Sequence, residues 1–128
     1  MTFMLDASAV LAAIFEEPGG DEVFEVLNTS TMSAINLGEV YATLLDGGMD
    51  LDEATAILDA LPVRIRTHRD AHARQTGRLR PLTKHLGLSL GDRACLAHAL
   101  MTDMPVLTSD RRMAEANGLE GLDIRMIR

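Results

Sequence analysis

Two aspartates each stand between a short apolar run and a helical pattern. Asp6 follows the run at residues 3–5, and Asp110 follows the run at residues 105–108 after one further residue. Both runs read as buried strands of a parallel sheet. Because open α/β sheets bind ligands at the carboxyl ends of their strands, we expect the two carboxylates to face one site. Alternatively, each aspartate only caps the helix that follows it.

A third aspartate, Asp92, begins a predicted helix at residues 92–101. It shares a helical face with Cys95 and Leu96, so this face should pack inward. A carboxylate that points inward needs a partner or a metal ion. Residues 89–92 also fit the Ser/Thr-x-x-acid capping box, and the two roles are compatible.

The chemistry that such acids support is metal-dependent phosphodiester hydrolysis. Clusters of oxygen ligands suit Mg²⁺ or Mn²⁺, which activate water and neutralise charge on a phosphate. Other sites are less favoured. Cys95 lies on an apolar face and should be core, while His68 and His72 have helical spacing but lack a further ligand and should be surface residues. No phosphate-binding glycine motif is present.

Charge is distributed unevenly along the chain, whose net charge is −7. The first 63 residues hold no Lys or Arg and twelve acids, whereas residues 64–85 hold six Arg, one Lys and three His against one acid. Such asymmetry indicates a charged ligand or partner. We expect the basic segment to position an RNA backbone; its candidate residues are Arg69, Arg74, Arg78 and Arg80. The alternative is that these arginines pair with the acids of residues 16–59, within the chain or across a dimer.

Length and composition predict one globular domain over residues 1–128, with 47% apolar residues. Strands at 3–5, 31–33, 63–66, 105–108 and 124–127 alternate with helices, which predicts an α/β fold with a mostly parallel sheet. The connections after residues 33 and 66 should each hold two helices. Aromatic residues make up 3%, which argues against an aromatic base-stacking platform. With no apolar run of membrane length, no recognisable signal peptide and one cysteine, a cytoplasmic protein is expected.

Four stretches together resemble the PIN-domain ribonucleases, and especially the VapC-type toxins of toxin–antitoxin pairs. They are MLDASA at residues 4–9, NLGEV at 36–40, LSLGDRACLA at 88–97 and VLTSD at 106–110, and the third is the most specific. The resemblance implies a five-stranded parallel sheet flanked by helices, a homodimer and RNA cleavage that depends on Mg²⁺ or Mn²⁺. It also implies an antitoxin partner that inserts Arg or Lys into the acidic site.

By the same resemblance, the metal-binding and catalytic residues are Asp6, Glu39, Asp92 and Asp110. Periodicity alone would leave Glu39 solvated, opposite the apolar stripe of its helix. Ser8, beside Asp6, is expected either to contact substrate or to cap the helix. Two other functions stay open, namely a non-catalytic PIN-like module that binds RNA or protein, and a metal-dependent phosphatase or DNA nuclease. The presence of all four acids favours the ribonuclease over the binding module.

Overall fold

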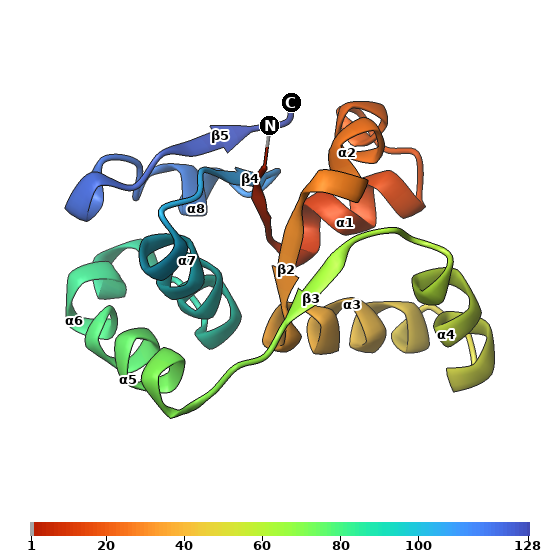
Figure 1. Ribbon diagram of the computed structural model, residues 1–128, viewed down its shortest axis with the longest axis horizontal. Helices are drawn as coiled ribbons and strands as arrows, with labels where there is room; N and C mark the ends of the chain where they lie inside the picture. Colours follow the sequence, from red (N-terminus) through yellow and green to blue (C-terminus); the bar gives the residue numbers. More distant parts are fainter. Residues whose placement is uncertain (1) are drawn as a thin grey trace.

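The computed structural model describes residues 2–128, whose strands form a five-stranded sheet in the order β3-β2-β1-β4-β5 (Figure 1). Every neighbouring pair of strands is parallel, which confirms the predicted α/β class. The strands are β1 (Met4–Leu5), β2 (Thr31–Ser33), β3 (Arg64–Arg66), β4 (Val106–Thr108) and β5 (Ile124–Met126).

Eight α-helices connect these strands in the described part of the chain. They are α1 (Ala7–Ile14), α2 (Gly20–Val26), α3 (Ala34–Asp46), α4 (Leu51–Asp59), α5 (Asp70–Arg78), α6 (Arg80–Thr83), α7 (Leu90–Thr102) and α8 (Arg111–Ala114). The prediction of two helices between β3 and β4 was wrong, because α5, α6 and α7 all lie there. Helix α6 has four residues and a proline in its first turn, so it is too short to show a helical period.

The sheet separates two hydrophobic cores. Side chains alternate along a strand, so Phe3 and Leu5 join one core while Met4 between them joins the other. Figure 1 shows α1 to α4 on one side of the sheet and α5 to α8 on the other. Because both faces are covered at the centre of the sheet, the central strands β1 and β4 are mostly apolar, whereas the edge strand β3 is Arg-Ile-Arg and is largely exposed.

Strands β1 and β4 lie side by side at the point where the chain changes direction across the sheet. From β1 the chain continues to β2 on one side, and from β4 it continues to β5 on the other side. Such a switch point leaves a crevice at the carboxyl ends of the two strands. Asp6 and Asp110 follow these ends, and the backbone N–H of Asp6 donates to the Leu107 carbonyl at 3.4 Å.

No helix within residues 2–128 is both long and apolar enough to cross a membrane.

Candidate active site

Asp6 is a buried carboxylate whose two oxygens are both hydrogen-bonded. Its Oδ1 accepts from the Ala9 N–H at 2.9 Å and from the Ser8 hydroxyl at 2.7 Å, and its Oδ2 accepts from the Thr108 hydroxyl at 2.5 Å. Burial raises the pKa of Asp6, the negative charge of Asp92 adds to this rise and the three hydrogen bonds oppose it, so that the pKa is about 6. Asp6 therefore both caps α1 and presents a carboxyl group that titrates near neutral pH.

Two hydroxyls link the ends of β1 and β4. The Thr108 hydroxyl donates to Asp6 and accepts from the backbone N–H of Asp110 at 2.9 Å. The Ser8 hydroxyl donates to Asp6 and accepts from the backbone N–H of Ser109 at 2.9 Å. Both hydroxyl protons are thus directed at the Asp6 carboxylate. Ser8, predicted from sequence as a substrate contact, already has its donor and an acceptor position occupied within the protein.

Asp110 begins α8, and its Oδ1 accepts from the backbone N–H of Arg112 at 2.9 Å. The side chain is partly exposed, with the Arg112 guanidinium 3.9 Å away. Asp6 and Asp110 are therefore helix caps, as the alternative from sequence proposed. The same backbone geometry also brings them to one edge of the sheet, on either side of Thr108.

Asp92 completes a reciprocal capping box at the start of α7. Its Oδ2 accepts from the Ser89 N–H at 2.9 Å, while the Ser89 hydroxyl accepts from the Asp92 N–H at 3.2 Å. Asp92 is half-buried, and its charge raises the pKa of both Asp6 and Glu39. Asp92 thus closes its helix and lies within electrostatic reach of two other acids.

Glu39 lies on α3 against the first turn of α7. Its Oε1 accepts from the Asn36 amide at 2.8 Å, and its carboxylate rests on Gly91, where a Cβ atom would overlap it. Burial raises the pKa of Glu39, the Asn36 hydrogen bond opposes this rise, and Asp92 adds to it. The expectation of a solvated Glu39 from periodicity was wrong, because α7 covers this polar side of α3.

Cys95 lies beneath the acids, one helical turn after Asp92. Its thiol is fully buried, and burial raises its pKa well above the usual value. The negative charges of Asp6, Asp92 and Glu39 raise this pKa further, so each of the three carboxylates lies within electrostatic reach of the thiol. The prediction of a core cysteine is confirmed, and at neutral pH this thiol holds its proton.

The donor set of this region is made of oxygen atoms. Within residues 2–128, no three Asp, Glu, His or Cys side chains converge closely enough to hold an ion by themselves. Mg²⁺ usually takes one or two carboxylates, keeps several waters and adds substrate phosphates. The residues fit an ion of that kind, and they do not form the closed cage of a structural zinc site.

The four predicted RNA-binding arginines are exposed on or beside α5 and α6, which lie on the same side of the sheet as α7 (Figure 1). Arg78 forms a two-pronged pair with Glu120, at 2.8 Å and 2.7 Å. In the described chain none of the four forms an ion pair with the acids of residues 16–59. Intrachain pairing with those acids therefore does not account for the basic segment.

Three histidines form a cluster between α5 and α7. His98 is fully buried, its ring stacks on that of His72 with centroids 4.1 Å apart, and its Nε2 lies 2.9 Å from Nδ1 of His68. The prediction that His68 and His72 are simple surface residues was wrong. Sequence gave no sign of this contact, because His98 stands thirty residues further along the chain.

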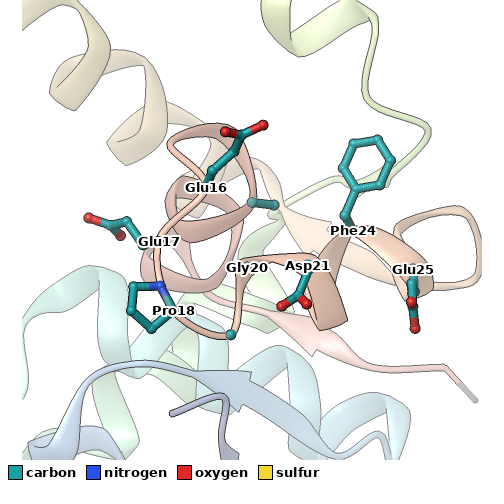
Figure 2. Close-up of a pocket in the computed structure, with 9 residues that line it drawn as sticks. Glu16, Glu17, Pro18, Gly20, Asp21, Phe24 and Glu25 are labelled. Carbon is teal, nitrogen blue, oxygen red and sulfur yellow. The ribbon is translucent and has the colours of Figure 1, made fainter.

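A pocket of about 710 Å³ lies at the turn between α1 and α2, and none of the four site acids lines it (Figure 2). Figure 2 shows Glu16 and Glu17 on the turn, with Asp21, Phe24 and Glu25 along α2. The Phe24 side chain is 60% exposed. This acidic and partly apolar pocket is separate from the carboxylate cluster.

Sequence reasoning assigned no role to three residues that hold the acids in place, namely Asn36, Gly91 and Thr108. Each stands within three positions of an acid, which was the available signal. Their contacts depend on how α3, α7 and β4 meet, and local periodicity does not carry that information.

The sequence matches the family model described as PIN domain over residues 3–119. Comparison with the curated protein sequences finds no match.

Several solved structures share the fold. VapBC2 from Rickettsia felis, bound to a promoter DNA fragment, is 19% identical with a TM-score of 0.76 over 98% of both chains. DNA-bound VapBC from Salmonella typhimurium is 19% identical with a TM-score of 0.76, over 100% of this chain and 99% of that one. VapC20 of Mycobacterium tuberculosis, described as a sarcin-ricin loop cleaving toxin, is 16% identical with a TM-score of 0.72, over 92% and 97%. At these identities the likeness shows the fold, and the family model shows that the chain belongs to the PIN-domain family.

Proposed function

We propose that this chain is a Mg²⁺- or Mn²⁺-dependent endoribonuclease that acts as the toxin of a toxin–antitoxin pair. The observation that carries the proposal is the link from Asp6 through the Thr108 hydroxyl to the Asp110 N–H at the carboxyl edge of a PIN-domain sheet, with Asp92 within electrostatic reach of both Asp6 and Glu39. The structurally similar proteins support this assignment, since one belongs to the VapBC family of toxin-antitoxin systems and VapC20 is described as a sarcin-ricin loop cleaving toxin.

In this proposal Asp6, Glu39, Asp92 and Asp110 hold the metal. When bound, the ion would supply an activated water and neutralise charge on the scissile phosphate. Ser8 and Thr108 orient the Asp6 carboxylate through their hydroxyl protons. Since burial raises the pKa of Asp6 to about 6, a proton competes with the cation for this carboxylate in mildly acidic solution.

The basic segment supplies the positive field that an acidic nuclease needs to hold RNA. Arg69, Arg74 and Arg80 are exposed, and α5 packs on α7, the helix that carries Asp92. Contacts from these side chains would reach phosphates and fix the position of the strand without reading bases. Arg78 can contribute only if RNA competes with Glu120 for its guanidinium.

A toxin of this kind needs a partner that silences it. A basic antitoxin side chain inserted among Asp6, Glu39 and Asp92 would displace the metal, because Arg matches carboxylate geometry and the acids repel one another. The acidic pocket beside Phe24 offers such a partner a second, partly apolar contact (Figure 2). The proposal further includes that the chain forms a homodimer and acts in the cytoplasm.

The test is to sequence cellular RNA ends after brief expression of the chain, with Asp6→Asn as the matched control. The proposal predicts new ends at a restricted set of sites that are absent from the control. New ends in neither culture, together with RNA binding by the purified protein, would support the non-catalytic module. Metal-dependent cleavage of DNA or of a phosphate monoester, with RNA left intact, would support the phosphatase or DNA nuclease.

A further inference from the structure

Asn36 is a fully buried polar side chain three residues before Glu39 on α3. Its Oδ1 accepts a 2.6 Å hydrogen bond from the Ser33 hydroxyl, and the other end of the amide faces a carboxylate and a carbonyl oxygen, which identifies that end as the nitrogen. Its Nδ2 then donates to Glu39 Oε1 at 2.8 Å and to the Gly91 carbonyl at 3.0 Å. Both amide protons are therefore used, and one of them is used on an acid of the proposed site.

Gly91 holds the same carboxylate from another direction. A Cβ atom at this position would overlap both oxygens of Glu39, so only glycine lets the carboxylate lie against the α7 backbone. Gly91 also directly precedes Asp92. The contact between the Glu39 carboxylate and Gly91 therefore fixes Glu39 of α3 relative to Asp92 of α7. The Asn36 amide donates to both partners of this contact, the Glu39 carboxylate and the Gly91 carbonyl.

We propose that Asn36 and Gly91 form a clamp that positions the Glu39 carboxylate for metal binding. This rests on the proposed metal-dependent function and names two positioning residues for it. Asn36 acts through Glu39 and has no contact with substrate in the proposal. Partners that orient metal ligands typically change metal affinity or activity about 10–100-fold when they are removed.

A purely structural role is the competing explanation, since the Asn36 bond to the Gly91 carbonyl also ties α3 to α7. The two explanations differ in a double-mutant cycle. If Asn36 acts through Glu39, its removal adds little once Glu39 has become Gln. If it only stabilises the fold, its removal weakens metal binding by the same factor in both backgrounds.

The experiment measures Mn²⁺ affinity of the full chain by electron paramagnetic resonance, without RNA. We expect Asn36→Ala to weaken binding about tenfold in the parent and less than about twofold in Glu39→Gln. The matched control is Asn117→Ala, which removes a 2.8 Å hydrogen bond to the Ile124 N–H remote from the site and should leave Mn²⁺ affinity unchanged.

A second pair of variants distinguishes the clamp from a purely structural role if Asn36→Ala fails to fold or Glu39→Gln binds no measurable Mn²⁺. Gly91→Ala displaces the carboxylate while keeping Asn36 and should weaken Mn²⁺ binding about tenfold. Gly38→Ala, on the same helix with open space around its Cβ, should leave the affinity unchanged. A Mn²⁺ affinity of Gly91→Ala equal to that of the parent would overturn the clamp. Equal weakening by Asn36→Ala in the parent and in Glu39→Gln would also overturn it, as would a parent that binds no Mn²⁺.

The outcome is separable from that of the proposed function. If the coupled loss of Mn²⁺ affinity occurs in a protein that cuts no RNA, the ribonuclease proposal fails and the clamp stands. If the parent cuts RNA with Mn²⁺ and neither Asn36→Ala nor Gly91→Ala changes Mn²⁺ affinity, the clamp fails and the ribonuclease stands.

Discussion

The Thr108 hydroxyl donates a 2.5 Å hydrogen bond to Asp6 Oδ2 and so joins two strand ends that are 102 residues apart in sequence. The Thr108 hydroxyl oxygen also accepts a hydrogen bond from the Asp110 N–H, which places this threonine between two acids of the proposed site. Without this hydroxyl, a buried carboxylate oxygen and a backbone N–H would both lose a partner.

Thr108→Val, which keeps the side-chain shape, should destabilise the protein by about 1–3 kcal/mol because it leaves these two groups unpaired. The pKa of Asp6 should rise further, since the Thr108 hydrogen bond lowers it. Denaturant unfolding and carboxyl-carbon NMR titration measure the two effects. Thr108→Ser restores the hydroxyl and is the control; equal stability of the Val and Ser variants would contradict the role of this bond.

Asp6→Asn should remove a pH-dependent loss of stability from the metal-free protein. The folded pKa of Asp6 is about 6 against 3.8 in the unfolded chain, so the unfolded state loses this proton first as pH rises. The folded state therefore loses stability between these pKa values, by about 3 kcal/mol in total, and stays lower above them.

Unfolding by denaturant with a chelator present, in mildly acidic and in neutral buffer, measures this effect. In Asp6→Asn, the free energy of unfolding should no longer decrease between these two buffers, and any metal-dependent activity should be abolished. Asp50→Asn, at the exposed cap of α4, is the control and should change stability by less than about 0.5 kcal/mol. The same decrease in stability from mildly acidic to neutral buffer in Asp6→Asn and in the parent would contradict the raised pKa of Asp6.

His98 should resist protonation until strongly acidic pH. Burial, together with the neighbouring His72, His68 and Arg66, lowers the pKa of His98 to about 4. Because the folded pKa lies below the unfolded value of 6.5, the stabilisation is complete above 6.5 and is lost as pH falls through that window toward 4. Ring-proton NMR should show no titration of His98 in mildly acidic buffer, and titration near its unfolded pKa would contradict the burial.

Acid should also loosen the contact between α5 and α7, because protonated His98 cannot stay in its present site. Amide hydrogen exchange in α5 should therefore accelerate as pH falls, beyond its intrinsic pH dependence. His98→Leu places an apolar side chain that cannot be protonated at this position, so it should abolish the extra acceleration of exchange. If hydrogen exchange in α5 accelerated equally in the parent and in His98→Leu, a titratable group other than His98 would be responsible.

Arg74→Ala combined with Arg80→Ala should weaken RNA binding for all sequences alike. If both side chains contact phosphates, the slope of log affinity against log salt should decrease by about one unit for each lost contact. Filter binding at several salt concentrations measures the slope. Arg128→Ala, which loses the pair with Glu17, is the control. An unchanged slope in the double variant would exclude α5 and α6 as the RNA surface.

The sequence was sufficient for the central strands β1 and β4 because each is a short apolar run before a helix signal, while the strand at 63–66 was predicted from its alternation of apolar and charged residues. Residues 31–33 and 63–66 were predicted as strands, and β2 and β3 lie there. Asp6 and Asp110 could be placed at one edge because parallel strands end at the same side. The short helix α6 was missed because four residues do not make a helical period.

The placement of Glu39 could not be derived from periodicity and depended on the family resemblance. Glu39 is covered by the backbone of Gly91, and a glycine leaves no apolar signal on the facing helix. The histidine cluster was missed for a similar reason. His98 lies on a helix buried on nearly all sides, where no single stripe marks the face that meets α5.

The most direct test of the central claim is cleavage of a defined RNA by the purified chain and by its Asp6→Asn, Asp92→Asn double variant, each with Mn²⁺ and with a chelator. Four acids acting as one metal site predict cleavage by the parent only with metal, and none by the folded double variant under either condition. Undiminished cleavage by the double variant, or cleavage by the parent in chelator, would contradict the claim.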